Sequence, residues 1–233
     1  MRLEPVRIQQ LAPLSDEEIA TRVVAGDTGA FELLMRRHNQ LLFRTARSIL
    51  SDETDAEDAL QEAYIRIYAG LDGFKEKSKL KTWMTRIVFN ESIRFRERRS
   101  STKGRERSGL PLTSYDSGGE PLEPAMSSSK RMQMFDEAME LLTERERSVV
   151  MLRVIQGLST RETAASLGMS ESNVKISFFR AKPKLACALK GTGLKEVRQE
   201  LSFDGQRCDR LVAAVFRQLE SGPEGVSATP AGH

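Results

Sequence analysis

The sequence predicts an all-α protein of two small helical domains joined by a flexible linker, with a C-terminal helical extension. Three observations predict it. Apolar residues recur at helical spacing along most of the chain, and no segment alternates as a half-buried strand would. Three of the expected helices begin with Ser or Thr followed three residues later by Glu, the capping-box pattern. Residues 108–129 hold three prolines, three glycines and six serines without a basic residue, which is typical of a linker.

The first domain is expected over residues 15–107. Ser15 and Glu18 form a capping box that begins a short helix ending at Gly26. Three longer helices are expected after it, at 28–50, 54–70 and about 82–99, with a Gly- and Lys-rich loop over 71–81.

The second domain is expected over residues 130–190, with helices at 130–142 and 144–156 and two more after Ser159 and Ser170. Thr143 with Glu146 and Ser159 with Glu162 repeat the capping box. Ala164, Gly168 and Val174 supply the small contact residue, the turn and the apolar plug of a helix-turn-helix.

Residues 170–190 carry five basic side chains and one acidic. On the second helix of the motif, short polar side chains near the N-terminal end can reach base edges, and the cations beyond them can contact phosphates. The alternative is a plain three-helix bundle whose basic end complements the helix dipole.

Residues 191–233 form the extension. Residues 191–193 read Gly-Thr-Gly and break the preceding helix, whereas 208–219 place their apolar residues on one stripe. We expect this helix to dock within the chain in preference to a partner, and the residues after 220 to be disordered.

Composition excludes several classes of protein. There are 36 Lys and Arg against 33 Asp and Glu, two cysteines and two histidines, and no apolar run long enough for a membrane span. The N-terminus lacks the apolar core of a signal peptide, so a cytoplasmic protein is expected. No zinc pattern, P-loop or clustered carboxylate loop is present, so we expect no enzyme, no cofactor and no metal. Cys187 and Cys208 are interpreted as ordinary thiols in preference to a redox pair.

The net charge of +3 is a cancellation between segments. Residues 51–62 carry six acidic side chains and no basic one, and Asp55, Asp58 and Glu62 share one helical face. That face is either a protein interface or a solvated helix end. Residues 72–107 carry twelve basic side chains against five acidic. Within them Trp83, Arg86, Asn90 and Arg94 recur on one helical face that suits single-stranded DNA, although we expect Trp83 itself to pack internally.

Two blocks of sequence resemble a known family. DAEDALQEAYIRIY and KTWMTRIVFNESIR are similar to domain two of the extracytoplasmic-function (ECF) sigma factors of bacterial RNA polymerase, which belong to the sigma-70 family. LTERERSVVMLRVIQGLSTRETAASLGMSESNVKISFFRAKPKL resembles domain four of the same factors. The resemblance covers roughly residues 20–100 and 130–190, in the family's order.

The resemblance implies three sets of site residues. The acidic helix would bind the β′ clamp of the polymerase core through Asp55, Asp58, Gln61 and Glu62. The −10 element of the promoter, with one base flipped out, would be held by Phe74, Lys75, Lys77, Ser78, Lys79, Lys81, Arg86, Asn90 and Arg94. The −35 element would be read by Ser172, Asn173, Lys175, Ser177, Phe179, Arg180, Lys182 and Lys184.

The resemblance further implies that the protein acts as a monomer on the polymerase. It is also compatible with an anti-sigma factor as a second partner. KISFFRA departs from the family's more usual KSRLxRA, so the preferred promoter does not follow by analogy. The competing hypothesis is a helix-turn-helix regulator that binds duplex DNA without polymerase. That hypothesis accounts for the second domain, but it does not explain why an acidic helical face is followed by a basic helix in the first domain.

Overall fold

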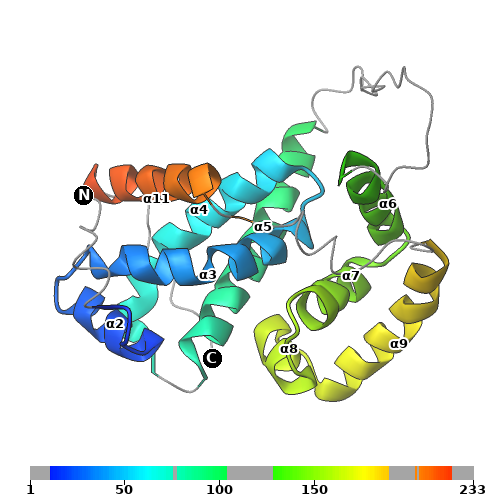
Figure 1. Ribbon diagram of the computed structural model, residues 1–233, viewed down its shortest axis with the longest axis horizontal. Helices are drawn as coiled ribbons and strands as arrows, with labels where there is room; N and C mark the ends of the chain where they lie inside the picture. Colours follow the sequence, from blue (N-terminus) through cyan, green and yellow to red (C-terminus); the bar gives the residue numbers. More distant parts are fainter. Residues whose placement is uncertain (1–10, 76–77, 104–127, 189–202, 204, 222–233) are drawn as a thin grey trace.

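A computed structural model describes residues 11–75, 78–103, 128–188, 203 and 205–221. These residues are helical with short connections and contain no strand, which confirms the predicted fold class (Figure 1). In the same residues, no helix combines the length and apolar character needed to cross a membrane.

The N-terminal unit consists of α2 (Asp16–Val24), α3 (Ala30–Arg47), α4 (Glu53–Gly70), the 3₁₀ turn η1 (Leu71–Gly73) and α5 (Leu80–Lys103). The predicted capping box of Ser15 and Glu18 is formed. Phe31 lies at the centre of the core, with its ring edge-on to Tyr64 and Tyr68 at centroid distances of 6.0 and 5.2 Å. Met84 and Val88 of α5 are fully buried, as their helical spacing predicts.

The C-terminal unit consists of α6 (Ser128–Glu140), α7 (Glu144–Val150), the π turn η2 (Met151–Ile155), α8 (Thr160–Leu167) and α9 (Glu171–Ala188). Both predicted capping boxes are formed. Gly168 ends α8 in the left-handed conformation, φ 63°, which only glycine adopts without strain. The helical stretch expected over 144–156 is present, although its second half, Met151–Ile155, winds as a π-helix instead of an α-helix.

The connection between the units lies mostly outside the described residues, at 104–127. The last two residues of the linker expected over 108–129 belong to α6. The two units nevertheless pack against each other, chiefly through α5 and α8, and Leu152, Ala164 and Leu167 join the core of the N-terminal unit. Three ion pairs cross the junction: Arg96 Nη1 to Glu144 Oε2 at 2.6 Å, Arg47 Nη2 to Asp136 Oδ1 at 3.1 Å and Lys81 Nζ to Glu162 Oε1 at 3.6 Å.

The extension forms α11 (Gly205–Glu220), which lies across α3 and α4 of the N-terminal unit (Figure 1). This confirms the expectation that the helix docks within the chain. Four residues of the predicted apolar stripe, Leu211, Val212, Val215 and Phe216, are buried, and the fifth, Leu219, is half-buried. Cys208, which was not counted in the stripe, is buried with them. Residues 191–193 and 222–233, which carry the predicted helix break and disordered tail, lie outside the described residues.

Candidate nucleic-acid interface

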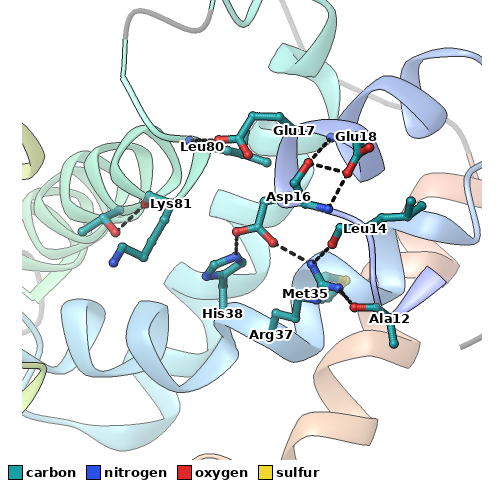
Figure 2. Close-up of polar contacts among 12 residues, drawn as sticks. Ala12, Leu14, Asp16, Glu17, Glu18, Met35, Arg37, His38, Leu80 and Lys81 are labelled. Carbon is teal, nitrogen blue, oxygen red and sulfur yellow. Dashed lines mark hydrogen bonds and ion pairs between the residues drawn. The ribbon is translucent and has the colours of Figure 1, made fainter. Parts of the chain in front are cut away.

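A set of polar contacts holds α2 against α3 and fixes the start of α5 (Figure 2). Asp16 Oδ2 lies 2.7 Å from His38 Nε2, and Asp16 Oδ1 accepts a hydrogen bond from Arg37 Nη1 at 2.9 Å. The hydrogen bond with His38, followed by the charges of His38 and Arg37, outweighs the desolvation and lowers the pKa of Asp16 to about 2. On the next residue, Glu17 Oε1 accepts a hydrogen bond from the backbone N–H of Leu80 at 3.2 Å. A carboxylate therefore satisfies one of the free donors at the N-terminus of the basic helix.

The acidic residues of α4 are divided between solvent and internal ion pairs. Asp58 is exposed, and partial burial followed by the charges of Glu57 and Glu62 raises the pKa of its carboxyl group. Glu62 is half-buried and paired with Arg98, whereas Asp55 is buried and paired with Arg99. Crowded carboxylates of this kind are stabilised by a cation from outside, so the exposed edge of α4 suits a basic partner surface.

Another part of α4, which includes Gln61, is in contact with α11. The Gln61 side chain, which is half-buried, donates to Gln218 Oε1 at 3.3 Å. Three turns before Gln218, Arg207 pairs with Glu57 at 2.7 Å and also with Glu53. The extension therefore neutralises part of the acidic helix, which the sequence did not indicate.

The basic face of α5 presents the predicted stripe. Arg86, Asn90 and Arg94 are exposed, and Glu91 holds the guanidinium of Arg94 at 2.6 Å. Trp83 is half-buried, with its ring 5.3 Å from that of Phe74 and in close contact with Gly70, which agrees with the expected packing role. An amide flanked by two guanidiniums on an open helical face can hydrogen-bond an unpaired base while the cations contact its backbone.

The loop before α5 completes this surface. Phe74 is half-buried, and the other described loop residues, Lys75, Ser78 and Lys79, are exposed. Lys81 is half-exposed and pairs with Glu162, and Lys77 lies outside the described residues. The structure thus brings the described members of the predicted −10 set together at one end and along one face of α5.

The predicted −35 residues lie on α9. Its N-terminal turn carries Ser172 and Asn173, which are exposed, as are Lys175, Phe179, Arg180 and Lys182. Phe179 is 80% exposed, an unusual position for a large apolar side chain. Two predicted residues are placed differently: Ser177 is buried at 7% exposure, and Lys184 Nζ pairs with the buried Glu146 at 2.8 Å. In this conformation neither Ser177 nor the ammonium of Lys184 is free to meet DNA.

Ile176 was not predicted as a site residue, although it is 49% exposed beside Phe179. Its spacing from Ser172 and Phe179 places it on their face of the helix, and that spacing was the signal that could have found it. In the part of the chain that the structure describes, no group of His, Cys, Asp and Glu side chains is arranged to hold a metal.

Two segments of the chain match known family models, and most of the chain is similar to several known proteins. Residues 34–102 match the family model Sigma-70 region 2, and residues 132–185 match Sigma-70, region 4. The chain is 33% identical to an RNA polymerase sigma-E factor of Streptomyces avermitilis, over 78% of this chain and 97% of that protein. It is 31% identical to the ECF RNA polymerase sigma factor SigM of Mycobacterium tuberculosis, over 74% of this chain and 83% of that protein.

The chain belongs to the ECF group of the sigma-70 family. Sigma factors are DNA-binding regulators that start transcription at specific promoters together with RNA polymerase, and that is the function of this chain. Among solved structures, this sigma factor resembles CnrH in its complex with the cytosolic domain of CnrY, with a TM-score of 0.56 and 26% identity over 76% of this chain and 99% of CnrH. The two matched regions end at residue 185, so α11 lies outside both.

Proposed function

We propose that this sigma factor divides its work among three helices. The exposed edge of α4 around Asp58 binds the β′ clamp of the polymerase core. The loop before α5 and the face of Asn90 hold an opened −10 element, and α9 enters the major groove at the −35 element. The observation that carries the proposal is the order of the three surfaces, an acidic helix, a basic helix with an exposed amide, and a basic helix-turn-helix, each in its matched region.

The proposed mechanism is positioning, without a catalytic step. Extracting one base from the duplex costs a few kcal/mol. Hydrogen bonds from Asn90 and contacts from Arg86 and Arg94 to the strand offset that cost once the polymerase is in place. The chain carries out this work in the cytoplasm as a monomer on the polymerase, and an anti-sigma factor that covers one of the three surfaces would prevent it.

The test measures the affinity for core polymerase of the wild-type chain and of two variants in which an acidic residue is replaced by alanine. Asp58→Ala removes the exposed carboxylate of α4, and we expect about tenfold weaker binding, since an exposed interface charge contributes on the order of 1–2 kcal/mol. Glu137→Ala removes an exposed carboxylate of α6, outside the proposed interface, and serves as the control.

Promoter-specific initiation by the assembled holoenzyme is the second measurement. If the chain binds specific duplex DNA but neither binds core polymerase nor supports initiation, it is a polymerase-independent helix-turn-helix regulator and the proposal is wrong. If Asp58→Ala and Glu137→Ala weaken core binding equally, α4 is not the surface that binds the β′ clamp, although the chain would still be a sigma factor.

A further inference from the structure

The outer face of α9 carries an apolar pair at its centre. Val174, Ser177 and Ala181 are its buried residues and define the inner face of the helix. Ser172, Ile176, Phe179 and Pro183 follow one another at intervals of four, three and four, so they form a single row on the opposite face. Ile176 is 49% and Phe179 80% exposed.

Exposed apolar side chains of this size are uncommon in the described residues. Besides this pair, only Val24 and Leu141 are comparably exposed there, and they lie on other elements. Two of the four therefore stand side by side on the helix that is predicted to enter DNA. Adjacent exposed apolar side chains rimmed by polar residues form a patch of the kind that marks an interaction surface, whereas single ones are common on any protein.

The charges around the pair indicate the kind of partner. Lys175 flanks the row on one side and Arg180 on the other, and both are exposed. A partner that meets this face must offer anions on both sides and an apolar group between them. The major groove of duplex DNA does so, because phosphates line both edges and the C5-methyl group of thymine projects from its floor.

We infer that Ile176 is a specificity-determining residue that, together with Phe179, reads the methyl group of thymine in the −35 element. The inference rests on the proposed function, in which α9 binds the −35 element, and adds the base chemistry that it selects. Ile176 has no group that can donate or accept a hydrogen bond, so it offers nothing to the polar edge of any base and gains contact energy only where a thymine presents its C5-methyl group. The chain should therefore prefer a −35 element with thymine, on either strand, opposite Ile176.

The test removes the methyl group alone. Holoenzyme assembled from the full chain and core polymerase first selects its −35 element from duplexes randomised at that position. Each thymine of the selected element is then replaced by deoxyuridine, which keeps every hydrogen-bonding group and lacks only the methyl. At one or two positions we expect about fourfold weaker binding to the wild-type holoenzyme, because burial of one methyl group contributes about 0.8 kcal/mol.

Ile176→Ala should bind the thymine and deoxyuridine duplexes equally at one of those positions. Leu141→Ala truncates another exposed apolar side chain and should keep the wild-type discrimination. The inference is overturned if the selected element contains no thymine, if wild type does not distinguish thymine from deoxyuridine at any position, or if Ile176→Ala still distinguishes them at every position at which wild type does. A holoenzyme that selects no −35 element at all would instead refute the proposed function of α9.

Discussion

The pairing of Asp16 with His38 and Arg37 makes a quantitative prediction about stability. Because the pKa of Asp16 is lowered from 3.8 to about 2, its ionised form is favoured in the folded protein. One pKa unit corresponds to about 1.4 kcal/mol, and the Asp16 side chain is 23% exposed, so the carboxylate stabilises the fold by about 2 kcal/mol at neutral pH.

The lowered pKa of Asp16 also determines how its contribution to the free energy of unfolding changes with pH. A depressed pKa stabilises the protein above the unfolded value of 3.8 and ceases to do so as the pH falls toward 2. Asp16→Asn should therefore lower the free energy of unfolding by about 2 kcal/mol at pH 7 and by only about half as much at pH 3.

Urea unfolding of the full chain measures this difference. Trp83 is the single tryptophan and lies in the same unit, so its fluorescence reports the transition. Asp72→Asn removes an exposed carboxylate of η1 and should change the unfolding free energy by less than about 0.5 kcal/mol. If the difference between wild type and Asp16→Asn is the same at pH 7 and pH 3, the stabilisation does not come from the ionised carboxylate.

Three further predictions concern other parts of the chain. Gly168→Ala should lower the unfolding free energy by about 1–2 kcal/mol because an L-residue is strained at φ 63°, whereas its Cβ would find ordinary contacts; an unchanged melting temperature would contradict this. Asn90→Ala should slow promoter opening, followed by permanganate reactivity of the −10 thymines, while affinity for core polymerase stays the same; normal opening would remove Asn90 from the −10 site. Arg207→Ala should cost about 1–2 kcal/mol in urea unfolding, since the guanidinium lies 4.7 and 4.9 Å from the ring centres of Phe43 and Phe203 as well as beside Glu57, and a difference near zero would mean that these contacts do not stabilise the docked helix.

Local signals in the sequence predicted most of the helix boundaries. A capping box such as Thr143 with Glu146 depends on residues three positions apart, so its geometry is contained in the sequence pattern. The same holds for Gly168, whose left-handed conformation is a local requirement of the turn. The grouping of Arg86, Asn90 and Arg94 was also predictable, because a single helix fixes their relative positions.

Contacts between distant segments were not predictable in this way. Nothing within a few residues of His38 indicates that it meets Asp16, and nothing near Lys184 indicates Glu146. The burial of Ser177 depends in the same way on which face of α9 packs against the rest of its unit. The apolar stripe of residues 208–219 predicted that the last helix must be covered, but the choice of α3 and α4 required the tertiary structure.

The docking of α11 on α3 and α4 makes the N-terminal unit depend on a helix that is translated last among the described helices. Tyr64 donates to Asn39 Oδ1 at 2.6 Å, and Asn39 Nδ2 donates in turn to Cys208 Sγ at 2.8 Å, so a buried chain of hydrogen bonds begun by the N-terminal unit ends on the extension. Domains generally fold as they leave the ribosome, N-terminal parts first. Here, however, Cys208, the hydrogen-bond partner of Asn39, lies 169 residues further along the chain, so α11 is translated long after the helices α3 and α4 that it covers. A chain that ends before residue 216 lacks Phe216 and with it part of the apolar face that covers α3 and α4, so we expect the N-terminal unit to reach its full stability only after α11 has been made.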